Sequence, residues 1–276
     1  MRILVSSICF VNRNRPGAEI YATFAKRLVN DIMTKTVHDI MVTTNEVENF
    51  NDEILQYGER IIVREEKLEN HILFLGVFNQ LLKFYTIKNI DSKYDWVLYL
   101  DCDAGLTGNW DNNEITSTIN NWESLGYDMM ATRTNAIVGQ ELKKHEELEI
   151  IHQNEITNGN LTHYNPRNLF SDKFIFYNVS TQNGPSEWLD AMMPSEHVLL
   201  IKNNDKLQKM ADIFEDFCYK FETQDKDFPT TVDMEAFEIG VSAKLAGYNM
   251  GDFGNYGLYV ILKVQCNHNN WEKKKY

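Results

Sequence analysis

Apolar and polar positions follow two different periods along the first third of the chain. RILVSSICF, residues 2–10, is an almost continuous apolar run of strand length, and HDIMVTTN (38–45) and RIIVRE (60–65) are similar runs. Between the first two runs, apolar residues recur at helical spacing from Ala18 to Ile32. Strands separated by helices predict a parallel sheet that is covered on both faces.

A fourth apolar run lies in the middle of this series. YDWVLYLDCDAGL, residues 94–106, is typical of a buried strand and follows a largely apolar helix that we expect over 71–90. Asp101 and Asp103 come where the strand stops, at the carboxyl end where open α/β sheets bind ligands. Side chains two apart in an extended segment point the same way, so both acids are expected to face one cation. The alternative is a turn whose side chains accept backbone N–H bonds.

Beyond Gly108 the pattern is less regular. The elements expected there are a strand at 127–134, a charged surface helix at 140–155, a strand at 196–204 and a helix over 228–249. Asn204 or Asp205 could cap a further helix after the second of these strands. Gly247 marks the end of the last helix.

Length and composition indicate one compact domain. The chain has 276 residues, of which 43% are hydrophobic and 24% charged, ordinary values for a globular α/β protein. The expected fold at this point is α/β, a parallel sheet with helices on both faces. No repeat, low-complexity tract or clear linker divides the sequence.

The net charge of −13 bears on which partners the protein can bind. A polyanion binds to a cationic protein face, so we do not expect nucleic acid as a partner. A ligand that carries phosphate would need a divalent metal ion to neutralise its charge. The four cysteines have no CxxC spacing, which favours reduced thiols. No membrane span or signal peptide is recognised, so we expect a cytoplasmic protein, in a host cytoplasm if the gene is viral.

The carboxylate pair suits a particular kind of metal site. Where a substrate diphosphate shares Mg²⁺ or Mn²⁺, the protein usually supplies only one or two carboxylates. Phosphohydrolases that form an aspartyl-phosphate also use Asp-x-Asp after a strand. They usually carry it on their first strand, whereas three strand candidates precede it here, so this reaction is kept as the alternative.

LLKFYTIKNIDSKYDWVLYLDCDAGL, residues 81–106, resembles a segment of GT-A fold glycosyltransferases, especially the glycogenin and bacterial galactosyltransferase-like group. There, a helix with a basic residue leads into a strand that ends in the metal-binding Asp-x-Asp. The resemblance implies a GT-A-like fold with a Rossmann-type mixed central sheet and helices on both faces. It also implies Mn²⁺- or Mg²⁺-dependent transfer of a sugar from a nucleotide diphosphate sugar, such as a UDP sugar, to a glycan or protein acceptor. A catalytically silent sugar-binding or scaffold protein that keeps this fold is the second alternative. Residues 1–110 would be the nucleotide-sugar-binding half, 111–265 the acceptor-side half with a helical insertion, and 266–276 a tail closing on the metal site.

The resemblance also implies a set of donor-binding residues. Asp101 and Asp103 would bind the metal, Asp101 would also touch the ribose, and Cys102 would lie between them in the donor site. Lys83 would reach the donor sugar or phosphate; its alternative role is that of an exposed helix lysine. Three residues of SSICFVN would cradle the base and ribose: Ile8, Phe10 and Asn12. For Phe10, a place in the core is the alternative.

In similar enzymes a histidine near the C-terminus binds the metal. The resemblance therefore implies that His268 is a metal ligand. CNHNNWEKKKY, residues 266–276, keeps this histidine and the nearby Trp271 but lacks the glycine and the Lys-Pro-Trp order of the family. The family's phosphate-binding lysine is therefore not assigned to Lys273. Imidazole with carboxylates suits Mn²⁺ better than Ca²⁺. A solvated tail residue is the alternative for His268.

Acceptor-side residues are implied in two further places. SEHVLLIKN resembles the family's Asn-Ala-Gly strand but has Ser195, Glu196 and His197 there, which offers Glu196 as a partner for a sugar hydroxyl. Asp233 and Glu235 resemble an acidic pair beside the acceptor, where a general base contributes about 10² to 10⁴ in rate. Acidic charge at a helix N-terminus is their alternative role. The sugar, acceptor, stereochemistry and oligomeric state are left open.

Overall fold

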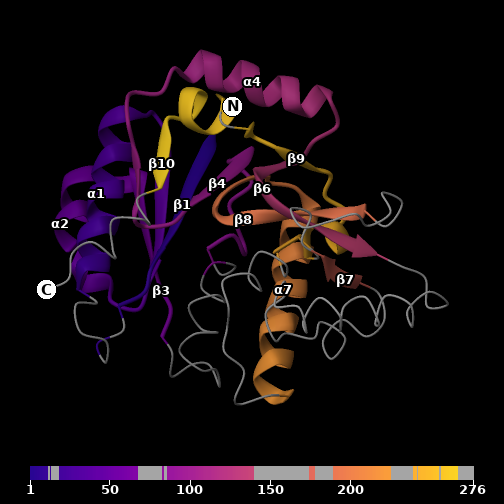
Figure 1. Ribbon diagram of the computed structural model, residues 1–276. Coiled ribbons are helices and arrows are strands. Elements are labelled where there is room, and N and C mark those ends of the chain that lie inside the picture. The colour runs from indigo at the N-terminus through magenta and orange to yellow at the C-terminus, as the bar shows by residue number, and fades with distance from the viewer. Residues whose placement is uncertain are drawn as a thin grey trace, which may run out of the picture.

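The computed structural model shows an α/β fold built around one mixed sheet (Figure 1). The residues that it describes are 1–11, 13, 19–67, 83, 86–139, 174–177, 189–224, 239–240, 242–254 and 256–266. The strands of the main sheet are β1 (Ile3–Cys9), β2 (Asp39–Thr44), β3 (Ile61–Glu65), β4 (Trp96–Leu100), β6 (Met129–Gly139), β7 (Phe174–Tyr177), β8 (Leu189–Lys202) and β9 (Met250–Asp252). A smaller sheet joins β5 (Ala104–Leu106) to β10 (Val264–Cys266).

The helices divide into long covering helices and short turns. The α-helices with given bounds are α1 (Ile20–Lys35), α2 (Asn51–Tyr57), α4 (Asn112–Ser124) and α7 (Asp205–Gln224). The shorter helical segments are η1 (Val47–Phe50), η2 (Gly58–Arg60) and η7 (Tyr256–Ile261), the last a π-helix. None of the described helices has the length and apolarity needed to cross a membrane.

The main sheet has the order β3-β2-β1-β4-β8-β6-β7, and β9 pairs with β6. The four N-terminal strands run parallel, as their separation by helices predicts. β8 then pairs antiparallel with both β4 and β6, which makes the sheet mixed. A strand from late in the chain therefore lies in the middle of the sheet. The sheet joins residues 1–110 to residues 111–265.

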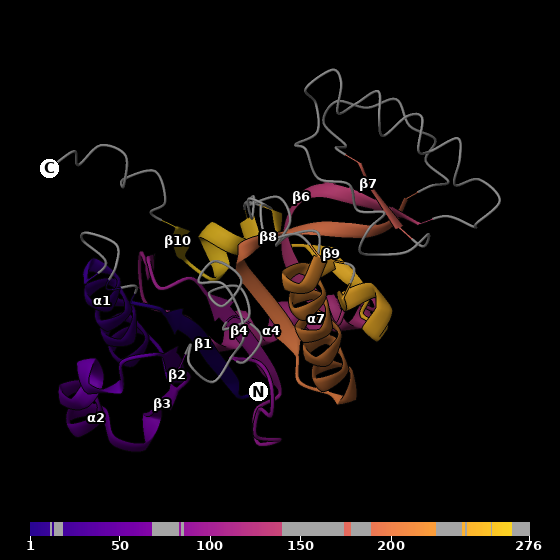
Figure 2. The same cartoon turned by 90° about the horizontal axis from the view of Figure 1, so that it is seen from below.

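Helices cover both faces of the sheet, as expected. Alternate residues of β4 point to opposite faces, so Leu98 joins the cluster that contains α1 and α4 residues, while Val97 and Tyr99 join the cluster that contains α7 residues. Figure 2 shows the strands passing between α1 and α7. All five residues of β4 are buried, because helices cover this strand on both faces.

Two helix ends confirm signals in the sequence. Asn204 Oδ1 accepts a hydrogen bond from the Lys206 backbone N–H at 3.0 Å, so Asn204, rather than Asp205, caps α7. Gly247 has a φ of +95°, and its N–H donates to Lys244 O at 3.0 Å. Glycine adopts this left-handed conformation without a steric penalty, which explains why the helix ends there.

The other expectations after residue 66 are met in part. The helix expected over 71–90 ends earlier, because residues 86–89 form a turn, and apart from Lys83 its residues up to 85 lie outside the described part. The strand expected at 127–134 is the longer β6, and the one at 196–204 is the last part of β8. The charged helix expected at 140–155 lies outside the described residues.

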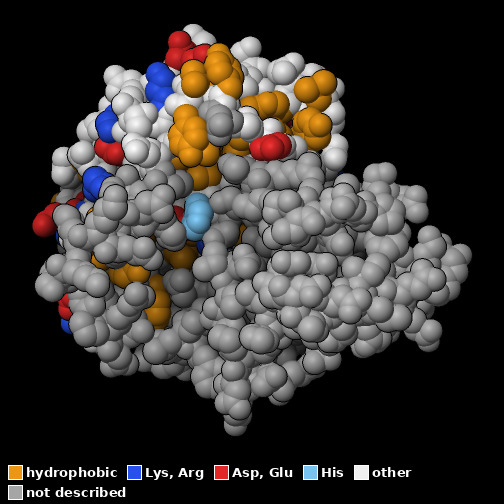
Figure 3. Space-filling view, viewed as in Figure 1, with side chains coloured by type: hydrophobic (Ala, Val, Ile, Leu, Met, Phe, Trp, Pro, Cys, Tyr) orange, Lys and Arg blue, Asp and Glu red, His pale blue; other side chains and the backbone are white. Residues whose placement is uncertain are grey.

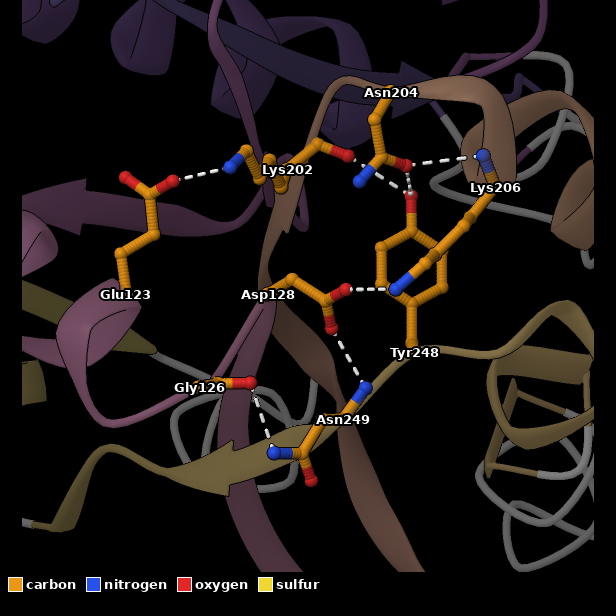
Figure 4. A network of polar contacts seen from close by, with 8 residues as sticks. All are labelled: Glu123, Gly126, Asp128, Lys202, Asn204, Lys206, Tyr248 and Asn249. Carbon is orange, nitrogen blue, oxygen red and sulfur yellow. Dashed lines mark hydrogen bonds and ion pairs between the residues drawn. The ribbon is translucent and has the colours of Figure 1, made fainter.

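A polar network fixes the end of the sheet where β4 begins (Figure 4). Asp128, just before β6, forms an ion pair with Lys206 of α7 and accepts the Asn249 backbone N–H at 2.6 Å. Tyr248 donates its hydroxyl to Lys202 O at 2.9 Å. The network joins β6, β8, α7 and the approach to β9. The carboxyl end of β4, where Asp101 follows, is the opposite end of this strand.

Hydrophobic side chains reach the surface around α4 and η7, where Figure 3 shows them gathered. Tyr256, Tyr259 and Val260 of η7 are exposed, while Leu258 and Ile261 of the same segment are buried in the core. The π-helical segment therefore packs one side inward and presents apolar groups to solvent on the other.

Candidate functional site

The candidate site begins where β4 ends. Leu100 is the last residue of the strand, and Asp101 follows it at the carboxyl end of the parallel strands β1, β2 and β4. β4 has β1 on one side and β8 on the other, so Asp101 lies away from the sheet's outer strands. Open α/β sheets bind ligands at this edge.

Asp101 and Asp103 belong to a turn and not to an extended segment. The Ala104 backbone N–H donates to Asp101 O at 2.9 Å, which closes the turn before β5 begins. We expected the two carboxylates to point the same way because the chain would be extended here. The backbone is not extended at these residues, so that expectation is wrong in its reason. The turn alternative is correct for the backbone, but the Asp101 side chain is bound by other side chains.

Three side chains hold the Asp101 carboxylate. The Tyr99 hydroxyl donates to Oδ1 at 2.7 Å, and Lys83 Nζ lies 3.8 Å from the same oxygen. His197 Nδ1 lies 2.6 Å from Oδ2. These groups come from β4, from β8 and from the segment before β4. The carboxylate is thus contacted on both oxygens.

Lys83 is buried, with 5% of its side chain exposed, so the alternative of an exposed helix lysine is wrong. Its ammonium also lies 5.1 Å from the centre of the Tyr99 ring, a cation–π distance. A buried ammonium is stable only with a compensating charge or hydrogen bonds, and Asp101 supplies such a charge. Lys83, Tyr99 and Asp101 therefore form one electrostatic unit.

These contacts keep Asp101 ionised. Burial by itself raises the pKa of this carboxyl, but the Lys83 charge, His197 and the Tyr99 hydroxyl outweigh it and hold the pKa at about 2. At neutral pH the carboxylate carries a full negative charge without any need to release a proton. A cation or a hydrogen-bond donor could bind it directly.

The turn is fastened to α1 by three side chains spaced four residues apart. Arg27 donates to Asp103 O at 2.9 Å, and Asp31 accepts the Leu106 backbone N–H at 2.9 Å. Lys35 donates to Leu106 O and lies 2.6 Å from Asp31 Oδ1. Residues four apart share one helix face, so a single face of α1 positions β5 and the turn before it.

β10 reaches the same turn from the other end of the chain. It pairs antiparallel with β5, and Cys266 lies opposite Ala104. The chain therefore runs along β5 toward the turn, and its last described residue lies beside the one that follows Asp103. His268, two residues further on, lies outside the described part.

The remaining predicted residues are placed as follows. Ile8 is buried, and Phe10 packs half-buried against the core cluster that contains α7 residues. Cys102 is a buried free thiol whose pKa burial raises well above its usual value, so it stays protonated. Glu196 lies in β8, but its side chain is not described. Three other predicted site residues lie outside the described part: Asn12, Asp233 and Glu235.

Sequence reasoning missed His197, Tyr99 and Arg27 as site residues. Tyr99 lies two residues before Asp101 in an extended strand, a spacing that could have indicated a shared side. His197 is separated from Asp101 by 96 residues, and no local pattern indicates that β8 pairs with β4. The Asn45 side chain is a further missed contact, bonding both Val11 N, at 2.8 Å, and Val11 O, at 2.9 Å, just after β1.

The donor set fits a hard divalent cation in part. Ionised carboxylate oxygens are the ligands that Mg²⁺ and Mn²⁺ prefer, and Asp101 and Asp103 lie in one short turn. Among the residues that the structure describes, however, no three His, Cys, Asp or Glu side chains are grouped so as to hold a metal. A complete site would need oxygen atoms from a ligand or a side chain beyond Cys266.

No protein-family model matches this chain, and no curated protein matches it.

Proposed function

We propose that this protein is a glycosyltransferase of the GT-A type that transfers a sugar from a nucleotide diphosphate sugar, with UDP sugars as the first candidates, to a glycan or protein acceptor. The observation that carries the proposal is the ionised Asp101 at the carboxyl end of a buried central strand. Asp103 follows in the same turn, and β10 ends beside it. The mixed α/β sheet is compatible with the fold of this enzyme class.

Asp101, Asp103 and His268 are the residues that would hold Mn²⁺ or Mg²⁺. The bound cation would offset the negative charge that develops on the diphosphate as the sugar bond breaks. The chain itself contributes orientation: α1 fixes the turn through Arg27 and Asp31, and β5 holds β10 beside it. A turn fixed in this way loses little freedom when a ligand binds.

Lys83 supplies a positive charge next to Asp101. Its buried ammonium, next to Asp101, could also bind a phosphate or sugar oxygen of the donor. Ile8 and Phe10, at and just after the end of β1, would line the base and ribose side together with Asn12. Glu196 remains a candidate for binding a sugar hydroxyl.

General-base catalysis is assigned separately. Asp233 or Glu235 would accept the acceptor proton in an inverting reaction. Neither residue lies in the described part of the chain, so this assignment rests on the resemblance alone.

The geometry favours this reaction over an aspartyl-phosphate mechanism. In the phosphohydrolase, Asp101 would be the nucleophile and would need an available oxygen lone pair of some basicity. Here the bonds from Tyr99 and His197 leave one lone pair on each oxygen, enough to bind a cation, whereas a pKa of about 2 makes the carboxylate a weak base and a poor nucleophile. A role in holding charged or polar ligands agrees better with these contacts.

A thermal-shift screen of nucleotide sugars, with and without Mn²⁺, tests the proposal. A ligand at about 100 times its dissociation constant adds roughly 2.7 kcal/mol to stability. We expect one donor to raise the melting temperature only with Mn²⁺ and to release its nucleoside diphosphate on incubation. Asp103→Asn should abolish both effects. Turnover of a generic aryl phosphate would support the phosphohydrolase, and a shift without turnover would support a silent sugar-binding protein.

A further inference from the structure

His197 and Asp101 are joined twice. The Asp101 backbone N–H donates to His197 O at 3.1 Å, continuing the β4–β8 ladder beyond the pair of Leu100 and Val198. The His197 ring then meets the Asp101 carboxylate through Nδ1 and Oδ2 at 2.6 Å. The backbone bond brings the two residues together, and the side-chain bond sets the direction of the carboxylate.

The opposite carboxylate oxygen is held independently. Tyr99 donates to Oδ1 at 2.7 Å, and Lys83 lies on the same side at 3.8 Å. Rotation of the carboxylate would break the bond from Tyr99 or the bond from His197. Asp101 is therefore fixed in one orientation even though it follows the end of its strand.

The proton position on His197 follows from this geometry. An ionised carboxylate only accepts hydrogen bonds, so the ring nitrogen that faces Asp101 must carry a proton. Histidines that meet a carboxylate through one nitrogen have their tautomer and ring orientation set by that contact. The short Nδ1–Oδ2 distance agrees with a hydrogen bond to an ionised acceptor.

We propose that His197 is a positioning residue of this site, which holds Asp101 in the orientation that receives the metal and the donor. The proposal rests on the proposed function and deepens it. It separates two roles: Asp101 contacts the ligand, and His197 acts through Asp101. Among the described residues, Tyr99 and His197 contact Asp101 at 2.7 Å or less, and His197 is the one from the later half of the chain.

Mn²⁺ binding in the presence of UDP, followed by electron paramagnetic resonance of the free ion, tests this role. His197→Ala should weaken Mn²⁺ binding about tenfold or more, as loss of a partner behind a metal ligand typically does. His197→Asn should retain most of the affinity, because its side-chain amide nitrogen is attached at the same position as Nδ1 and can donate to Oδ2. Lys202→Ala, at the last position of the same strand, is the matched control.

The outcomes for the variants distinguish failure of the positioning role from failure of the proposed function. If His197→Ala binds Mn²⁺ as tightly as the wild type while Asp101→Asn does not, the positioning role is wrong and the proposed function stands. Equal losses in His197→Ala and His197→Asn would contradict positioning and indicate direct contact by the imidazole. A wild-type protein that binds no Mn²⁺ with UDP would overturn both. Should His197→Ala fail to fold, His197→Phe replaces it.

Nitrogen NMR of the histidine rings gives a readout that is independent of metal. We expect the His197 signal, assigned by its loss in His197→Asn, to show a proton on Nδ1 in the metal-free protein. Asp101→Asn should change this signal, because the amide alters the acceptor. A His197 ring without a proton on Nδ1 would overturn the proposal.

Discussion

Cys266, the last residue of β10, lies opposite Ala104, so β10 ends alongside the turn that holds Asp101 and Asp103. Val264 lies opposite Leu106 in the same pair, which sets the direction: β10 runs toward the turn and not away from it. β10 therefore ends, at Cys266, beside the residue that follows Asp103. This arrangement gives a physical basis for testing His268 as a site residue.

Replacing His268 with alanine should weaken Mn²⁺ binding in the presence of UDP by more than about tenfold, since even an outer partner of a metal ligand usually contributes that much. Isothermal titration with Mn²⁺ measures the change. His145→Ala, in the stretch expected to be a charged surface helix, is the control and should bind Mn²⁺ normally. Unchanged binding in His268→Ala would make His268 a plain tail residue.

Asp31→Ala should lower the free energy of unfolding by about 1–3 kcal/mol, because it leaves the buried Leu106 N–H without its acceptor. Urea denaturation measures this loss. Asp31→Asn should cost less, since the amide oxygen can still accept that bond. Asp52→Ala, at an exposed position in α2, should stay within about 0.5 kcal/mol of the wild type. An Asp31→Ala protein as stable as this control would show that α1 does not fasten β5.

His38 should make the protein less stable in mild acid. Burial, the largest effect, lowers the pKa of His38 from 6.5 to about 4, and its Nε2 has no hydrogen-bond partner among the described residues. Between these pH values the unfolded chain binds a proton that the folded protein does not. The stabilising contribution is complete above pH 6.5 and is lost as the pH falls to 4, by up to about 3 kcal/mol.

The change His38→Leu tests this contribution. Denaturant unfolding at several pH values should show a flatter dependence of stability on pH between 4 and 6.5 than in the wild type. An identical slope in the two proteins would mean that other groups cause the acid sensitivity.

Gly251→Ala should destabilise the pairing of β9 with β6. An added Cβ would lie 2.6 Å from Sδ of the buried Met130 and 2.9 Å from the ring of the half-buried Tyr127, too close for either neighbour. Overpacking of this kind costs about 1–3 kcal/mol. Gly108→Ala is the matched control, because its Cβ would meet only the flexible Lys263 side chain, at 3.3 Å. Thermal unfolding compares the two, and equal melting temperatures would contradict the packing argument.

The parts of the fold that follow local rules could be predicted from the sequence. The first three strands are short apolar runs, and their ends differ from the expected ones by at most one residue. The fourth run divides, because β4 ends at Leu100 and β5 begins at Ala104. Asn204 and Gly247 mark helix ends through their own side chain or backbone freedom. The position of Asp101 at the carboxyl end of β4 could also be predicted, because the apolar run stops directly before it.

The arrangement of the site could not be predicted, because it depends on contacts between distant segments. The bond between His197 and Asp101 requires β8 to pair antiparallel with β4, and nothing near either residue specifies that pairing. The contact of Arg27 with Asp103 O similarly requires α1 to lie against β5. Lys83 looked equally suited to solvent and to the site, and only its burial beside Asp101 separates these alternatives.

The place of β8 between β4 and β6 also bears on how the protein is made. While a ribosome synthesises the chain, β4 emerges long before the strand that covers its second edge, and at about 5–20 residues per second the wait is roughly 5–20 s. During that time the nascent chain exposes an apolar strand with unpaired backbone groups, a typical starting point for aggregation. Chaperone dependence during synthesis is therefore expected to be set by the delay between Leu100 and Lys202.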